Sequence, residues 1–86
     1  MKSIQVKVMS EGGLHARPAS LLVSKATQFE SEIMLQKGEK KANAKSILNI
    51  MALSIKQGDE IRIEASGPDE EAAITTLTEL VQEQIG

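Results

Sequence analysis

The spacing of apolar residues changes period several times along this chain, which limits the folds that the chain can adopt. Ile4, Val6 and Val8 alternate with polar residues, and this alternation predicts a strand with one buried face. Over residues 16–27 the apolar positions lie three and four residues apart, which predicts a helix. The apolar stripe of this helix consists of Ala19, Leu22, Val23 and Ala26.

The middle of the chain predicts three more strands and a short helix. Alternation over residues 32–36 indicates a second strand, and the polar stretch 39–44 indicates a weak third strand at a sheet edge. Ser46 opens a short helix that is expected to run to about Leu53. Alternation over residues 61–65 predicts the fourth strand.

A last helix is predicted after Gly67 and Pro68, which end the fourth strand. Asp69, Glu70 and Glu71 are expected in its first turn, where carboxylates interact favourably with the positive end of the helix dipole. Its expected apolar stripe consists of Ile74, Leu77, Val81 and Ile85.

These elements predict a single α+β domain spanning residues 1–86. Each strand has one apolar and one polar face, which is typical of antiparallel sheets and requires the helices to share one face. We therefore expect an open-faced two-layer sandwich in the order β-α-β-β-α-β-α. It would consist of a four-stranded antiparallel sheet with three helices on one face.

Composition excludes several classes of function. A net charge of −2 offers no electrostatic basis for binding nucleic acid or an anionic membrane, and the single aromatic residue excludes a base-stacking surface. No apolar run is long enough to span a bilayer and no signal peptide is recognisable, so we expect a cytoplasmic protein. One histidine and no cysteine argue against a metal site, and no cofactor is expected.

The seven residues from Gly12 to Pro18 concentrate groups that suit a phosphoryl group. Pro18 fits only the first turn of a helix, so the helix is expected to begin within a residue or two of His15. A helix start offers free backbone N–H groups and partial positive charge, and the Arg17 guanidinium could bind the same anion. The same positive end is expected to lower the pKa of the His15 imidazole, leaving a nucleophilic nitrogen at neutral pH.

The residues alone leave a plainer interpretation open. His15 could be a solvated residue near a helix start, and Arg17 an ordinary surface charge. A Ser-His-Asp hydrolase is disfavoured, because so short a chain has little room for both a substrate pocket and an oxyanion site.

The chain carries two separated motifs, G-L-H-A-R-P-A at Gly13 to Ala19 and N-A-K-S-I at Asn43 to Ile47. Both resemble motifs of the HPr family, the phosphocarriers of the bacterial phosphoenolpyruvate-dependent sugar phosphotransferase system. The resemblance covers essentially the whole chain, including S-G-P-D-E-E-A at Ser66 to Ala72. It implies a phosphoryl carrier that is a transfer intermediate and a kinase substrate, not a free-standing enzyme.

The resemblance also assigns roles to individual residues. His15 would accept phosphate on Nδ1 from phosphorylated enzyme I and pass it to the IIA domains of sugar permeases. Arg17 would be the electrostatic partner of the phosphoryl group, and the backbone N–H groups of Ala16 and Arg17 would bind its oxygens.

Ser46 has two explanations. A serine directly before an apolar run is a preferred N-cap, which by itself accounts for the residue. In Gram-positive relatives the matching serine is phosphorylated by an HPr kinase/phosphorylase, which links the protein to a catabolite-control transcription factor and carbon catabolite repression. The resemblance therefore implies a regulatory phosphorylation site at Ser46.

The short helix carries more apolar residues than one buried face needs. Ile50 and Leu53 share one direction of the helical wheel, and a second direction holds Ile47, Leu48, Met51 and Ile55. Leu21 lies off its own stripe and could join this second set in a docking surface for partners. Coverage by loops or complete burial would explain the pattern equally well. The expected docking residues are Leu21, Ile47, Leu48 and Met51.

A few positions depart from the family pattern and bear on partner choice. Gly12 stands where many members have Ser, Thr or Asn, and Leu48 where Met is frequent. Asn49 and Ser54 stand where glycine is common in related chains.

Three other functions compete with the carrier. One is a purely regulatory module like the catabolite-repression paralogue of the family, which usually has Gln in place of His15. The others are a phosphocarrier of the nitrogen-related branch and a small scaffold domain.

Overall fold

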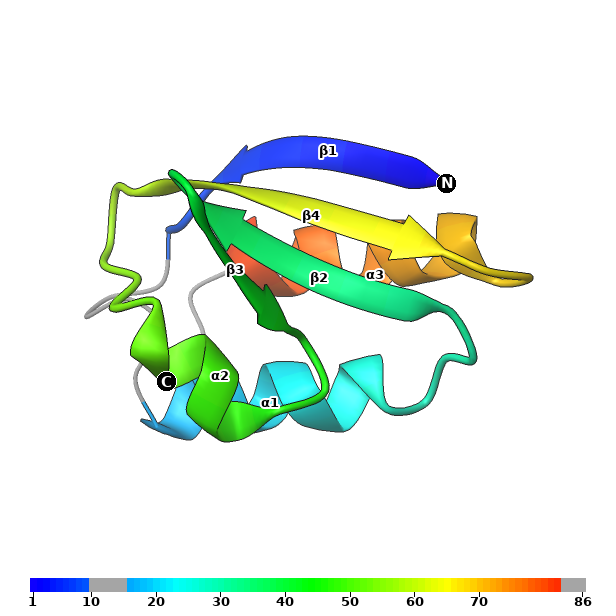
Figure 1. Ribbon diagram of the computed structural model, residues 1–86, viewed down its shortest axis with the longest axis horizontal. Coiled ribbons are helices and arrows are strands. Elements are labelled where there is room, and N and C mark those ends of the chain that lie inside the picture. The colour runs from blue at the N-terminus through cyan, green and yellow to red at the C-terminus, as the bar shows by residue number, and fades with distance from the viewer. Residues whose placement is uncertain (10–15, 83–86) are drawn as a thin grey trace.

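Residues 1–9 and 16–82 are described by a computed structural model, with the backbone only for residues 16–18. Within these ranges, four strands form one antiparallel sheet, and three helices lie on one of its faces (Figure 1). The expected α+β sandwich and its element order are therefore confirmed. The elements are β1 (Lys2–Lys7), α1 (Ala16–Ala26), β2 (Glu32–Lys37), β3 (Lys40–Asn43), α2 (Ile47–Ala52), β4 (Glu60–Ser66) and α3 (Glu70–Gln82).

The strands lie in the spatial order β1-β4-β2-β3, so β4 and β2 are central and β1 and β3 are the edges. In the register Ile63 lies opposite Ile4 in β1 and opposite Leu35 in β2, and Leu35 lies opposite Ala42 in β3. Because opposite residues share a face, this row points toward the helices. Ile4 nevertheless keeps 38% of its surface exposed, so the expected burial of the whole first stripe is wrong at this edge position.

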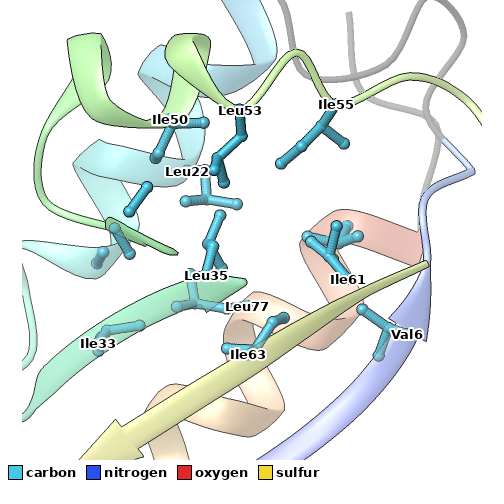
Figure 2. Close-up of a cluster of buried hydrophobic side chains, with 14 of the residues drawn as sticks. Val6, Leu22, Ile33, Leu35, Ile50, Leu53, Ile55, Ile61, Ile63 and Leu77 are labelled. Carbon is cyan, nitrogen blue, oxygen red and sulfur yellow. The ribbon is translucent and has the colours of Figure 1, made fainter. Parts of the chain in front are cut away.

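The hydrophobic core lies between the sheet and the helices (Figure 2). Leu22 of α1, Ile50 of α2 and Leu77 of α3 meet the central strands at Leu35 and Ile63, and all five side chains are fully buried. Burying a side chain of this size contributes roughly 1.5–3 kcal/mol relative to leaving it exposed. Apolar packing thus provides the stability that disulfides provide in many small proteins.

The stripe predicted for the first helix is the one that α1 buries. Ala19, Leu22 and Ala26 are fully buried, and Val23 is half-buried against the core. The two small alanines let the α1 backbone lie close to its neighbours.

The stripe predicted for the last helix is correct in part. Leu77 and Val81 are buried in α3, but Ala73 is the third buried residue and Ile74 is only half-buried. Ile85 lies outside the described residues. The buried face of α3 is therefore centred on Ala73, Leu77 and Val81, and Ile74 lies at its margin.

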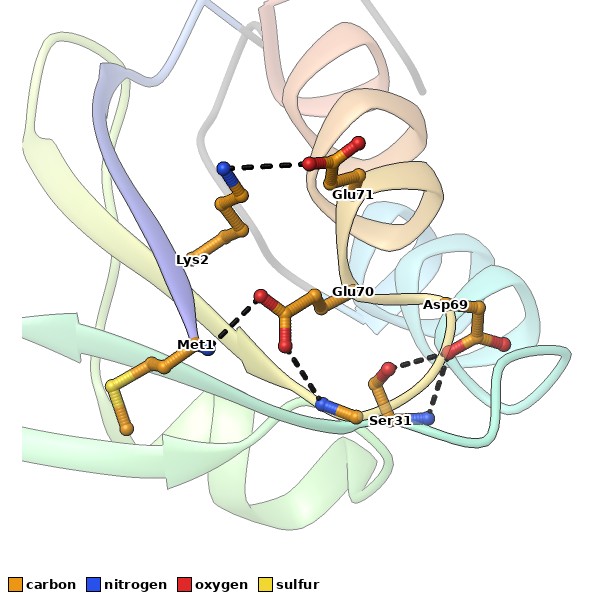
Figure 3. Close-up of polar contacts among 7 residues, drawn as sticks. Met1, Lys2, Ser31, Asp69, Glu70 and Glu71 are labelled. Carbon is orange, nitrogen blue, oxygen red and sulfur yellow. Dashed lines mark hydrogen bonds and ion pairs between the residues drawn. The ribbon is translucent and has the colours of Figure 1, made fainter.

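Asp69 connects the start of α3 to the turn before β2 (Figure 3). Its Oδ2 accepts a hydrogen bond from the Glu30 N–H at 2.9 Å, and its Oδ1 accepts from the Ser31 N–H at 3.0 Å and from the Ser31 hydroxyl. The placement of Asp69 in the first turn is thus wrong: α3 begins one residue later, and the carboxylate satisfies the neighbouring turn instead. The Ser31 hydroxyl, followed by the Glu30 N–H, lowers the pKa of Asp69.

Glu70 adds two further contacts at the same end of the sandwich. One of its oxygens accepts from the Gly67 N–H at 3.1 Å, and the other lies 2.9 Å from the α-amino group of Met1. These two contacts lower the pKa of Glu70, with the amino group as the larger cause. Beside them, Lys2 and Glu71 form an ion pair at 3.4 Å.

Gly67 is required by a close approach. Its φ is +154°, and a Cβ at this position would lie 2.6 Å from Ser31 Oγ and 2.7 Å from Ser31 Cα. The turn between β4 and α3 can therefore contact the Ser31 backbone only if residue 67 has no side chain.

Candidate functional site

His15 and Gly12 lie outside the described residues, as does the side chain of Arg17. The backbone of α1 begins at Ala16, so Ala16 and Arg17 are the first two residues of an α-helix. The expectation that this helix begins within a residue or two of His15 is confirmed. The first N–H groups of an α-helix have no acceptor within the helix, which is what the predicted phosphate-binding role of Ala16 and Arg17 requires.

The chain on the N-terminal side of this region is held by backbone hydrogen bonds to two other parts of the fold. Val8 exchanges hydrogen bonds of 2.8 Å with Gly58 and Asp59, which lie in the loop before β4. The Met9 N–H donates to the Val81 carbonyl near the end of α3 at 3.3 Å. The segment that enters the predicted phosphorylation site is thus anchored to the loop after α2 and to α3.

Ser46 caps α2, as expected from its position. Its Oγ accepts a hydrogen bond from the Asn49 N–H at 3.3 Å, and its own N–H donates to the Asn43 carbonyl at 3.0 Å. The Asn43 side-chain oxygen stabilises the preceding turn by accepting a hydrogen bond from the Lys45 N–H at 2.9 Å. The capping role is therefore confirmed, and phosphorylation of Ser46 stays a prediction.

The excess apolar face of α2 is exposed. Ile50 is fully buried and Leu53 nearly so, whereas Leu48 keeps 80% of its surface exposed and Met51 42%. Ile47 is exposed as well, as is Leu21 on the adjacent α1. We call this set the α1–α2 surface. It consists of Leu21, Ile47, Leu48 and Met51.

The prediction that Ile55 lies on the outer face of the short helix is wrong. Its side chain is only 3% exposed and belongs to the core (Figure 2). The helical wheel fails here because α2 ends at Ala52 and Ser54 has a φ of +53°. The chain reverses at Ser54, and the reversal turns Ile55 inward.

A contact that the sequence pattern does not reveal lies next to this reversal. The ammonium group of Lys37, at the end of β2, donates to the Ser54 carbonyl at 2.7 Å and lies 3.0 Å from Asp59 Oδ2. The same Asp59 oxygen accepts from the Lys56 N–H at 2.9 Å. The Lys56 N–H, followed by Lys37, lowers the pKa of Asp59. The one sequence signal for this turn is that Ser54 departs from the pattern of the family that the chain resembles.

A shallow hollow lies on the opposite side of the sheet from the helices. It measures about 260 Å³ and is lined by Gln5, Gln36, Gly38, Glu60 and Arg62. Its lining is polar, and its place on the open face separates it from α1 and α2.

Within residues 1–9 and 16–82, no three His, Cys, Asp or Glu side chains come together as the ligands of a metal ion would. None of the helices there has the length and apolar character needed to cross a membrane.

Curated relatives of this chain include phosphocarriers and an HPr-like protein. "Phosphocarrier protein HPr" of Lysinibacillus sphaericus is 47% identical over 83 residues, covering 96% of this chain and 94% of the relative. "HPr-like protein Crh" of Bacillus subtilis is 43% identical over 81 residues, covering 94% of this chain and 95% of the relative.

The fold agrees with that of solved HPr structures. The crystal structure of HPr-C-His from Thermoanaerobacter tengcongensis superposes with a TM-score of 0.92 at 45% identity, covering 95% of this chain and 92% of that one. A family model described as "PTS HPr component phosphorylation site" matches residues 2–83. On this evidence the chain belongs to the HPr family of the phosphotransferase system.

Proposed function

We propose that residues 1–86 act as one cytoplasmic phosphocarrier domain of the sugar phosphotransferase system. His15 accepts a phosphoryl group from phosphorylated enzyme I and passes it to the IIA domains of sugar permeases. The observation that carries the proposal is the start of α1 at Ala16, directly after the histidine, in a chain of the HPr family. The phosphocarrier relatives support it.

The chemistry needs a nitrogen nucleophile and a place for negative charge. A lone pair of His15 Nδ1 attacks phosphorus while the bond from phosphorus to the donor breaks, so the phosphoryl group moves without loss of atoms. Its oxygens then meet the helix-start N–H groups of Ala16 and Arg17 and the guanidinium of Arg17.

A carrier must also release what it binds. Each additional 1.4 kcal/mol of binding to the phosphoryl group would shift the equilibrium of the next transfer about tenfold against release. A short helix start with few side-chain ligands suits this requirement better than an enclosed pocket.

Labelling by phosphoenolpyruvate tests the proposal. The chain is incubated with Mg²⁺, enzyme I and radiolabelled phosphoenolpyruvate, and the adduct is then exposed to acid and to base. We expect an acid-labile, base-stable adduct that the His15→Ala variant does not form. An unlabelled wild-type protein, or equal labelling of the variant, would contradict the carrier function.

We further propose that Ser46 is a regulatory phosphorylation site, modified by an ATP-dependent HPr kinase/phosphorylase. A phosphate at the N-cap of α2 would face the positive end of the helix, so the fold should persist. It would add a charge of roughly −2 beside Ile47 of the α1–α2 surface and repel an acidic partner. The kinase should add acid-stable phosphate to the wild type and none to Ser46→Ala, and equal labelling of the two would remove this assignment.

A second candidate is a purely regulatory module that binds a catabolite-control transcription factor, and the Crh relative favours it. The histidine separates the two functions, because the regulatory paralogue usually has Gln there. A chain that accepts phosphate from its kinase but never from enzyme I would be such a module.

A further inference from the structure

We infer that Lys37 and Asp59 form a clamp that positions the C-terminal end of α2, and with it Met51 of the α1–α2 surface. The inference rests on the proposed function in one respect: it takes this surface as the docking site for enzyme I. Lys37 is then a positioning residue, since it acts on docking through α2 and not through contact with the partner.

The clamp joins segments that are distant in sequence. Lys37 ends β2, and its ammonium group bridges the Ser54 carbonyl at 2.7 Å and Asp59 Oδ2 at 3.0 Å. Both side chains keep 31% of their surface exposed, so the contact is partly shielded from water. One cation therefore fastens the beginning and the end of the loop between α2 and β4 to the sheet.

The clamp acts at the residue of the loop whose backbone conformation is least favourable, Ser54. Ser54 is the non-glycine residue with positive φ in the described part of the chain, at +53°. A side chain in this conformation is strained, because Cβ approaches the backbone carbonyl. The hydrogen bond from Lys37 is made to the carbonyl of this same residue and so favours the strained geometry over its relaxed alternatives.

The strained turn is connected directly to the docking residue. The Ser54 N–H donates to the Met51 carbonyl at 3.1 Å, and the Leu53 N–H donates to the Ile50 carbonyl at 3.1 Å. If Ser54 relaxed to negative φ, its carbonyl would turn away from Lys37, and the bonds next to this change are those at the end of α2. Loss of Lys37 should therefore loosen the end of α2 while the buried core contacts of Ile50 persist.

The test compares Lys37→Met with Lys41→Met. Lys41 is a matched control, since its ammonium group pairs with Glu64 at 3.5 Å on the sheet, and none of the hydrogen bonds or ion pairs found in the described residues joins it to the loop after α2. The first measurement is amide hydrogen exchange at Leu53 and Ser54. We expect exchange about tenfold faster in Lys37→Met and unchanged in Lys41→Met.

The second measurement is the phosphorylation rate with enzyme I as a function of carrier concentration. We expect Lys37→Met to raise KM about threefold to tenfold with little change in kcat, because docking and not chemistry is affected. The double variant Lys37→Met/Ser54→Gly should recover much of both readouts, since glycine adopts positive φ without strain. A general loss of packing would not be repaired by glycine at this one position.

Unchanged exchange in Lys37→Met, or no recovery in the double variant, would overturn the clamp. A wild-type protein that enzyme I does not phosphorylate would refute the proposed function instead. In that case the exchange data on Leu53 and Ser54 still decide whether Lys37 positions the end of α2.

Discussion

The two ends of the sandwich, which lie at opposite ends of the long axis in Figure 1, are built differently. At the end with the β4–α3 turn, carboxylates of Asp69 and Glu70 are held by backbone N–H groups and by the Met1 amino group. At the end with α2, apolar side chains such as Leu48 are exposed and Ser54 is strained. Polar contacts occur at both ends, since Lys37 and Asp59 pair beside Ser54, but only the α2 end combines them with an exposed apolar surface.

The difference has a physical basis. A surface that binds partners must leave apolar area uncovered, which adds nothing to the stability of the isolated protein. The opposite end is free to satisfy its backbone donors internally, and unsatisfied donors there would be costly because Ser31 is fully buried. Substitutions at the two ends should therefore separate stability from docking.

The largest effect is expected from Gly67→Ala at the carboxylate end. The new methyl group would meet Ser31 Oγ at 2.6 Å, so either the turn or Ser31 must move. We expect a loss of about 2–3 kcal/mol in the free energy of unfolding, measured by urea denaturation. Gly38→Ala is the control: its φ is also positive, at +61°, but nothing lies within 4 Å. Equal losses in the two variants would show that conformation and not crowding limits residue 67.

Ser31→Ala should have the next largest effect. It removes a buried hydroxyl that donates to Asp69 and leaves the two backbone hydrogen bonds in place. We expect a loss of about 1–2 kcal/mol in urea denaturation at neutral pH. Ser24→Ala on the exposed side of α1 should change the free energy of unfolding by less than about 0.5 kcal/mol. A loss no larger than this in Ser31→Ala would mean that the hydroxyl is dispensable.

Acidification should weaken the same end. The pKa of Asp69 is lowered in the folded protein from its ordinary value of 3.8, and that of Glu70 from 4.5. A carboxyl group with a lowered pKa stabilises the fold fully above its ordinary pKa, and this contribution is lost as pH falls through the folded value. Urea midpoints should therefore be nearly constant near neutrality and fall below about pH 4.

Ser31→Ala provides the comparison for this acid transition. The Ser31 hydroxyl is the largest cause of the lowered pKa of Asp69, so its removal should make the fall in urea midpoint shallower. The contribution of Asp59, whose pKa is lowered at the other end, should be the same in both proteins. Identical pH profiles would contradict the assigned role of Ser31.

The smallest effect on stability is expected at the α2 end, from Met51→Glu. Met51 is 42% exposed, so the free energy of unfolding should change by no more than about 0.5 kcal/mol. Affinity for enzyme I, measured by calorimetry, should fall by about tenfold or more, because a charge would enter the apolar docking surface. Thr75→Glu adds the same charge to an exposed position of α3 and should bind like the wild type. Unaltered binding of Met51→Glu would exclude Met51 from the interface.

The regular elements were predictable from sequence because their apolar periods match their buried faces. The stripe of α1 and the alternation in β2 and β4 are examples, as is the N-cap at Ser46. For the second apolar face of α2 the sequence left exposure and burial open, and the structure shows exposure at Leu48 and Met51.

The contacts at loops and edges were not predictable, because they depend on tertiary neighbours. Asp69 is a residue type that favours a helix start, but its side chain binds the turn at Ser31 instead. Ile55 fits the helical spacing of α2, but it follows the reversal of the chain at Ser54 and is buried. Lys37 is an unremarkable strand residue until the fold places Ser54 and Asp59 beside it. The assignment of His15 as phosphate acceptor likewise rests on motif and family.

The most direct test uses the fact that this chain contains one histidine. With ¹⁵N-labelled histidine, the two imidazole nitrogens give all of the side-chain signals, which are followed by NMR before and after phosphoenolpyruvate and enzyme I are added. We expect the Nδ1 signal to shift and to split through coupling to ³¹P, with Nε2 free of phosphorus. Imidazole signals that stay unchanged while the donor system is active would contradict the claim that His15 carries phosphate.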